Sequence, residues 1–153
     1  MGREPIPTWF FALVVVRLGR RFLLVREAKH EKTWYLPGGR LNVGESLQDG
    51  ARRETMEEAG IPVALEGVLR IEHNPSPSGH SRVRVIFVGR PRDDSPPKSV
   101  ADDHSLEAGW FTLEEMKKLT LRGEEVAAAC EHVSRGGIVY PLRIIGNEGG
   151  AWE

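Results

Sequence analysis

The segment from Gly39 to Ile61 constrains the fold of this chain more than any other part of it. A proline-free run of good helix formers extends from Ser46 to Ala59 within this segment. Ser46 with Asp49 three residues later is typical of a helix N-terminus, and Gly60 is typical of a helix end. Short apolar runs that predict strands lie on both sides of this predicted helix.

Apolar runs predict short strands around this helix, with β-branched and aromatic residues enriched in the first of them. The predicted strands are residues 9–16, 22–25, 34–36, 63–72, 82–88 and 107–111. The sequence Pro37-Gly38-Gly39 is expected to stop regular structure. The first two strands are expected to form a hairpin, and the first is expected to be buried on both faces.

The second half of the chain alternates a long loop with two further helices. Residues 91–104 are rich in proline and aspartate and are expected to form a mobile surface loop of a length that is often functional. Thr112 and Glu115 form a capping box that predicts a short helix. A last amphipathic helix is predicted over residues 122–135, with Val126, Cys130 and Val133 on one side.

Length and composition predict a single domain. The chain has 153 residues, of which 40% are hydrophobic and 28% charged, and its formal net charge is −1. We therefore expect one domain over residues 1–153, with a core at about 9–135 and a frayed tail at 147–153. The balanced charge excludes a polybasic surface for duplex nucleic acid or an anionic membrane. The one cysteine, Cys130, predicts a reducing cytoplasm.

Three glutamates give the predicted helix its chemical character. Glu54, Glu57 and Glu58 stand at i, i+3 and i+4, so their carboxylates project from one stripe and repel one another. Arg53 relieves part of this repulsion, and a hard divalent cation would relieve more. A solvated acidic helix face is the alternative, and for these three residues alone it is favoured. Gly38 and Gly39 favour the cation site over a solvated face, because glycine lets the backbone approach an anion closely.

Seven residues at fixed spacing resemble the signature of the Nudix (MutT-type) pyrophosphohydrolases: Gly39, Glu45, Arg53, Glu54, Glu57, Glu58 and Gly60. Of the two aliphatic positions in that signature, Ile61 fits and Thr55 does not, which puts in doubt how tightly the helix packs. The resemblance implies the Nudix α/β/α sandwich, in which a mixed β-sheet is flanked by the signature helix and a C-terminal helix. It also implies hydrolysis of a nucleoside diphosphate linked to another group, with release of a nucleoside monophosphate.

The same resemblance implies roles for individual residues. The metal ligands would be Glu54, Glu57, Glu58 and the carbonyl of Gly39, and the cation would be Mg²⁺ or Mn²⁺. Arg53 would orient a glutamate, and Glu45 would stabilise the loop–helix geometry or assist at the metal. Glu54 is the first candidate for the general base. The alternatives are Asp102, Asp103 and Glu107, for each of which a plain surface role is favoured.

The substrate is less constrained by the sequence. We expect Tyr35, Gly38, Gly39 and Glu125 to contact a small-molecule nucleotide, as in MutT-like enzymes that act on oxidised guanine nucleotides. Packing is the favoured role of Tyr35 by position alone, and solvation that of Glu125. An ADP-ribose or nucleotide-sugar pyrophosphatase, a non-nucleotide diphosphate hydrolase and a non-catalytic nucleotide sensor stay open, as does the oligomeric state. The histidines, including His104, show no ligand spacing and are expected to be solvated.

Overall fold

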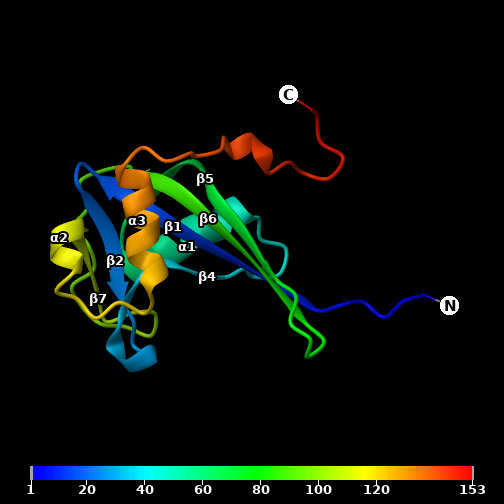
Figure 1. Cartoon of the computed structure of the whole chain (residues 1–153), viewed down its shortest axis with the longest axis horizontal. Helices are drawn as coiled ribbons and strands as arrows, with labels where there is room; N and C mark the ends of the chain where they lie inside the picture. The colour runs from blue at the N-terminus through cyan, green and yellow to red at the C-terminus, as the bar shows by residue number, and fades with distance from the viewer. Residues whose placement is uncertain (1, 153) are drawn as a thin grey trace.

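The computed structural model describes residues 2–152, and a mixed sheet forms its centre (Figure 1). The strands are β1 (Thr8–Leu18), β2 (Arg21–Arg26), β3 (Trp34–Tyr35), β4 (Gly38–Arg40), β5 (Val63–Asn74), β6 (Ser81–Pro91) and β7 (Glu107–Thr112). The helices are α1 (Leu47–Ala59), α2 (Leu113–Met116) and α3 (Glu124–Ser134), with short 3₁₀ turns η1 (His30–Lys32) and η2 (Leu142–Ile144). None of the helices in this described part is long and apolar enough to cross a membrane.

Strand β1 organises the sheet. The strand order is β3-β2-β1-β6-β5, with β4 also paired to β1 and β7 to β2. β1 runs parallel to β6 and antiparallel to both β2 and β4, so the sheet is mixed, as the sequence predicts. One edge of β1 is shared, because β4 pairs with its first half and β2 with its last residues. Because β4 pairs with β1, the chain that continues from β4 into α1 starts beside the middle of the sheet.

Two apolar cores lie on opposite faces of the sheet. Side chains alternate along β1, so that Val14 and Val16 pack on the α1 side while Leu13 and Val15 pack on the α3 side. Figure 1 shows α1 behind the sheet and α3 in front of it. The α/β/α sandwich is therefore confirmed. The first strand is buried on both faces from Ala12 to Val16, as predicted, but Trp9 and Phe10 at its start are exposed.

Residues 38–40 correct one sequence prediction. The glycine pair was expected to stop regular structure, but Gly38–Arg40 forms β4, with Gly38 opposite Leu13 and Arg40 opposite Phe11. A Cβ atom on Gly38 would lie 2.5 Å from the Ala12 carbonyl oxygen. The glycine thus allows two backbones to approach closely, a function that sequence alone does not separate from a turn.

The segment at 91–104 has no helix or strand after Pro91, as predicted, but it is not detached from the body. The Lys98 amide donates to the Ala59 carbonyl at 2.8 Å, and the Lys98 carbonyl accepts from the Ala108 amide at 2.8 Å. These two bonds tie the middle of the segment to the end of α1 and to β7. Most residues of the segment are exposed, so the predicted surface loop is present, and it is anchored to the body at Lys98.

A C-terminal segment covers the outer edge of the sheet. Val68 in β5 and Tyr140 exchange two backbone hydrogen bonds of 2.8 Å, so residues 138–145 lie along this edge. Gly67 makes room for the segment, because a Cβ there would lie 2.7 Å from the Tyr140 carbonyl oxygen. Residues 147–152 extend away from the body in Figure 1. No pattern in the sequence predicted this edge pairing.

Candidate active site

Helix α1 is fixed at both ends and along its buried side. The Ser46 hydroxyl accepts a hydrogen bond from the Asp49 amide at 3.1 Å, and Gly60 ends the helix with a φ of 70°. Thr55 is fully buried, and its hydroxyl donates to the Ala51 carbonyl at 2.8 Å. The hydroxyl of Thr55, the one residue that departs from the aliphatic pattern, thus has its hydrogen bond within the helix, and the side chain packs in the core.

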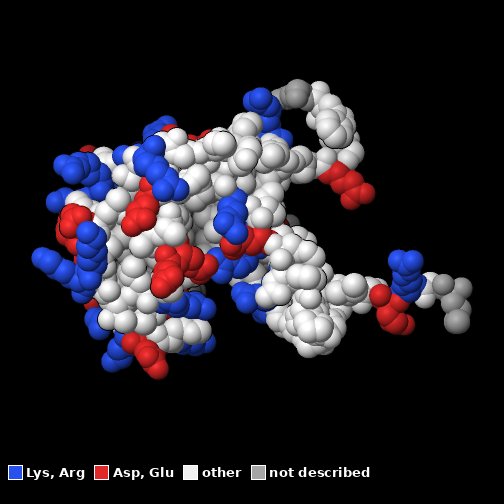
Figure 2. Space-filling model, viewed as in Figure 1, with Lys and Arg blue, Asp and Glu red and all other residues white. Residues whose placement is uncertain are grey.

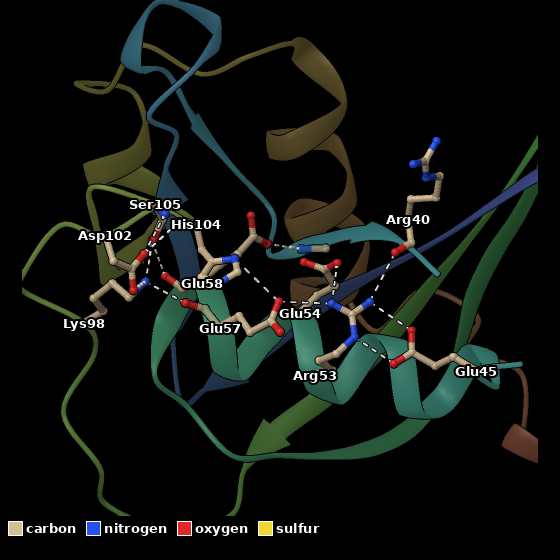
Figure 3. A network of polar contacts seen from close by, with 11 residues as sticks. Arg40, Glu45, Arg53, Glu54, Glu57, Glu58, Lys98, Asp102, His104 and Ser105 are labelled. Carbon is tan, nitrogen blue, oxygen red and sulfur yellow. Dashed lines mark hydrogen bonds and ion pairs between the residues drawn. The ribbon is translucent and has the colours of Figure 1, made fainter. Parts of the chain in front are cut away.

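Arg53 gathers three of the predicted site residues (Figure 3). Its guanidinium donates to both oxygens of Glu45, at 2.7 and 2.9 Å. It also donates to Glu54 at 2.9 Å and to Glu57 at 3.0 Å. The hydrogen bonds from Arg53 lower the pKa of Glu45 to about 2. Arg53 therefore holds Glu45 ionised and links the entry loop of α1 to the acidic face of the helix.

Glu58 faces a different partner from the other carboxylates. Its Oε1 accepts a hydrogen bond from the Gly38 amide at 2.7 Å, so α1 is joined directly to β4. Burial raises the pKa of Glu58 to about 8, and the nearby charges of Glu54 and Glu27 add to this effect. Burial also raises the pKa of Glu54. These raised values mark an acidic cluster whose charge the protein only partly compensates.

Two glycines permit close contacts at this face. A Cβ atom on Gly39 would lie 2.7 Å from the Glu54 carboxylate, so the backbone of β4 lies directly against that side chain. A Cβ atom on Gly50 would collide with Leu41 and would lie 3.1 Å from a Glu45 oxygen. Gly50, which costs helix stability, is therefore retained where the entry loop packs on α1.

The donor set of this face suits a hard divalent cation. Glu54, Glu57 and Glu58 offer carboxylate oxygens, and the backbone of Gly39 lies against the Glu54 carboxylate. The buried Oε2 of Glu27, whose charge reaches Glu58, has no hydrogen-bond partner among residues 2–152. Within residues 2–152 no three acidic side chains converge closely enough to form a ready cation cluster. The Arg53 guanidinium lies between Glu54 and Glu57 and supplies positive charge there.

The three alternative candidates for the general base differ in their surroundings. Asp102 accepts from Lys98 Nζ at 2.7 Å, and this contact lowers the pKa of its carboxyl to about 2. Glu107 pairs with Arg26 at 3.3 Å. Asp103 is exposed, and its side chain has no hydrogen bond or ion pair with any residue between 2 and 152. These contacts favour structural and surface roles, and Glu54 stays the first candidate.

Three side chains near the acidic face were not assigned to the site by sequence reasoning. Lys98 Nζ donates to the Glu57 carbonyl at 2.6 Å, and Ser105 Oγ donates to the Glu58 carbonyl at 2.6 Å. His104, expected to be solvated, is half-exposed with its Nδ1 3.6 Å from Glu57 Oε2. These residues lie some 40 positions after α1 in the chain, and no local pattern in the sequence marks them.

Tyr35 and Glu125, both predicted to contact substrate, meet on the opposite face of the sheet. The Tyr35 hydroxyl donates to Glu125 Oε1 at 2.5 Å, and Arg84 Nη2 donates to Glu125 Oε2 at 3.2 Å. Burial and the bond to Glu125 raise the pKa of Tyr35 to about 12. The Arg122 guanidinium stacks over the Tyr35 ring at 4.7 Å. The sequence analysis did not include Arg84 or Arg122.

A cavity of about 630 Å³ opens beside this cluster, between β5, β6, α3 and the C-terminal segment. Its floor includes Leu36, Leu69 and Ile86, and its charged lining includes Arg84, Glu72 and Glu125. An apolar hollow with a few fixed polar groups is typical of small-molecule sites. Leu36, which lines the cavity, lies two residues before Gly38 in the chain.

Comparison with known proteins identifies the family. The model of the NUDIX domain matches residues 9–130. The 8-oxo-dGDP phosphatase NUDT18 of Mus musculus is 39% identical over 92 residues, which cover 58% of this chain and 27% of that protein. The chain thus spans about a quarter of the length of that curated relative. The phosphatase NudJ of Shigella boydii is 28% identical over 134 residues, 87% of each protein.

Solved structures agree with the family match. The fold resembles a NUDIX hydrolase from Nitrosomonas europaea with a TM-score of 0.77 and 27% identity, over 95% of this chain and 99% of that one. It also resembles an ADP-ribose pyrophosphatase from Streptococcus suis, with a TM-score of 0.64 and 25% identity over 84% and 92% of the two chains. By its family match, its signature residues and its fold, this chain belongs to the Nudix family.

Proposed function

We propose that this chain is a divalent-cation-dependent hydrolase that cleaves a nucleoside diphosphate linked to another group and releases a nucleoside monophosphate. The observation that carries this proposal is the acidic face of α1 against β4. There the partly buried Glu58 has a pKa of about 8, and the backbone of Gly39 lies directly against the Glu54 carboxylate. A purely solvated acidic face does not account for a partly buried carboxyl bonded to a strand amide.

In this proposal Glu54, Glu57, Glu58 and the Gly39 carbonyl would hold Mg²⁺ or Mn²⁺. A bound cation would neutralise the pyrophosphate and lower the pKa of attacking water. Arg53 acts through other residues, since its bonds to Glu45, Glu54 and Glu57 fix how these carboxylates are presented. Glu45 anchors Arg53 from the loop before α1, where a carboxylate is also favoured by the helix dipole.

Glu54 is our first candidate for the general base. A base works best when its pKa lies near the working pH, and burial raises the pKa of Glu54 above its usual value. Its carboxylate lies against the Gly39 backbone, at the boundary between α1 and β4. Asp102 is a weaker candidate because Lys98 holds its carboxylate and lowers its pKa.

We propose an oxidised guanine nucleoside di- or triphosphate as the substrate, with its base in the cavity beside Tyr35 and Glu125. The cavity is lined by apolar side chains and a fixed Arg84–Glu125 pair, which offers a donor and an acceptor side by side. The relative NUDT18, named an 8-oxo-dGDP phosphatase, supports this choice. ADP-ribose is the second candidate substrate, because one structural relative is named an ADP-ribose pyrophosphatase.

Product release with Mg²⁺ tests the proposal. The panel is 8-oxo-dGTP, 8-oxo-dGDP, dGTP, ADP-ribose and diadenosine polyphosphates, and the Glu58→Gln variant is the blank. We expect turnover of an 8-oxo-guanine nucleotide that is absent in the variant. Turnover of ADP-ribose instead would select the second candidate. If no panel member is hydrolysed but one binds tightly in a Mg²⁺-dependent way, the chain is a nucleotide sensor. If no panel member is hydrolysed or bound, these substrates are rejected.

The domain organisation, the cellular compartment and the kind of partner are also proposed. We propose a single domain over residues 1–153 that works in the cytoplasm, since Cys130 is buried and unpaired. Figure 2 shows acidic and basic side chains interspersed on the face it draws, which supports a small-molecule substrate over duplex nucleic acid or a membrane.

A further inference from the structure

The last turn of α1 is held from outside the helix by the segment 98–105. Three consecutive carbonyls of α1 accept hydrogen bonds from it. The Lys98 amide donates to Ala59 at 2.8 Å, Lys98 Nζ donates to Glu57 at 2.6 Å, and Ser105 Oγ donates to Glu58 at 2.6 Å. The last carbonyls of a helix have no partner within the helix, and helix ends fray unless such groups are satisfied.

We call Lys98, Asp102 and Ser105 the clamp, because Lys98 and Ser105 bond to α1 and to each other while Asp102 bonds to both of them. Lys98 Nζ donates to Asp102 Oδ2 at 2.7 Å and to Ser105 Oγ at 3.0 Å. Asp102 Oδ1 accepts the amides of His104 at 2.8 Å and Ser105 at 3.2 Å. Figure 3 shows this network at the end of α1, beside Glu57 and Glu58.

Two of the three clamp side chains, Lys98 and Ser105, are buried to a degree that a simple helix cap does not need. Ser105 is fully buried, and the Lys98 side chain is only 12% exposed. Removing an ammonium group from water is costly unless it is fully paired, and here three acceptors surround it. Gly60 already ends the helix with its own amide bonded to Met56. The side-chain bonds from Lys98 and Ser105 go to the backbone carbonyls of Glu57 and Glu58, whose carboxylates lie in the last turn of α1.

We propose that Lys98 and Ser105 are positioning residues for the carboxylates of Glu57 and Glu58, an inference that rests on the proposed function. With its carbonyls fixed, the last turn holds both Cα–Cβ bonds at a constant angle to β4. A displacement of about 1 Å in a catalytic group can cost about a hundredfold in rate. Outer partners of ligand residues typically contribute about 10- to 100-fold to metal affinity or activity.

Substitution of Ser105 tests this inference without changing the charge. Ser105→Ala removes the donor to the Glu58 carbonyl. Ser81→Ala is the matched control, since Ser81 is also buried and its hydroxyl bonds to Thr8 at 2.9 Å, at the start of β1. For both variants and the parent, the measurements are the Mn²⁺ dissociation constant by electron paramagnetic resonance, kcat and KM for the substrate found with the panel, and the thermal midpoint.

We expect Ser105→Ala to raise the Mn²⁺ dissociation constant and lower kcat by about tenfold each, with KM within about twofold of the parent. Ser81→Ala should lower only the thermal midpoint. Lys98→Met, with the exposed Lys117→Met as its control, provides a second pair if Ser105→Ala does not fold. Parent-like Mn²⁺ affinity and kcat in both clamp variants would overturn the inference alone. A parent protein that neither binds Mn²⁺ nor turns over the panel would instead reject the proposed function.

Discussion

The Tyr35 hydroxyl and the Glu125 carboxylate, 90 residues apart in the chain, share a hydrogen bond of 2.5 Å. Arg84 binds the other oxygen of Glu125. Burial alone would raise the pKa of Glu125, but these two hydrogen bonds bring it below its usual value. Glu125 is thus ionised and holds the Tyr35 hydroxyl and the Arg84 guanidinium beside the cavity. From its position alone, Glu125 was expected only to be solvated.

Replacing Glu125 should change substrate choice more than overall rate. In Glu125→Ala, Tyr35 and Arg84 lose their shared partner, so the polar part of the cavity loses its fixed geometry. We expect the ratio of kcat/KM for 8-oxo-dGTP over dGTP to shift by about tenfold, in line with about 1–3 kcal/mol per polar base contact. Glu124→Ala, at the exposed neighbouring position, is the control. An equal loss for every purine would remove Glu125 from base recognition.

Loss of the Glu58 charge should separate activity from stability. Glu58→Gln keeps an acceptor for the Gly38 amide but removes a buried carboxylate beside Glu54 and Glu27. We expect turnover to fall at least about a hundredfold. The thermal midpoint in EDTA at pH 8, where part of Glu58 is ionised, should stay near the parent value or rise because repulsion is relieved. Assays at saturating Mg²⁺, with the exposed Glu66→Gln as control, check this. An active Glu58→Gln enzyme would contradict the metal-ligand assignment.

The stability of the metal-free protein should fall as the pH rises towards 8. The pKa of Glu58 is about 8 in the folded state and 4.5 by its ordinary value. Between these values the folded protein binds more protons than the unfolded chain, so the free energy of unfolding decreases with increasing pH. We expect a lower thermal midpoint at pH 8 than at pH 6 in EDTA, and a smaller difference in Glu58→Gln. Equal pH slopes in the two proteins would refute this.

A methyl group at position 39 should damage the site more than the fold. The Cβ of Gly39→Ala would lie 2.7 Å from the Glu54 carboxylate, which is the movable end of a side chain and can shift away. We therefore expect a loss of kcat of about tenfold or more with a modest change in thermal midpoint. Gly146→Ala is the matched control, because a Cβ at Gly146 meets nothing within 4 Å. Full activity in Gly39→Ala would show that this backbone approach is not needed.

Local sequence patterns predicted the parts of the molecule that depend on local physics. The caps at Ser46 and Gly60, the continuous apolar run of β1 and the spacing of Glu54 to Glu58 each act within a few residues, so they can be predicted from the sequence directly. The β4 strand could not be separated from a turn, because glycine serves both. Partners distant in the sequence, such as Lys98 with α1 or Tyr35 with Glu125, depend on tertiary packing that no short pattern encodes.

The backbone pairing between Val68 and Tyr140 also affects how the protein behaves at high concentration. β5 is the last strand of the sheet, and an open strand edge is a template for pairing with other molecules. Residues 138–145 occupy part of that edge, and Gly67 lets them lie close against it. A chain shortened to residue 137 would keep α1 and its carboxylates but would uncover these groups. Self-association and loss of solubility would then be its first defect, ahead of any change in chemistry.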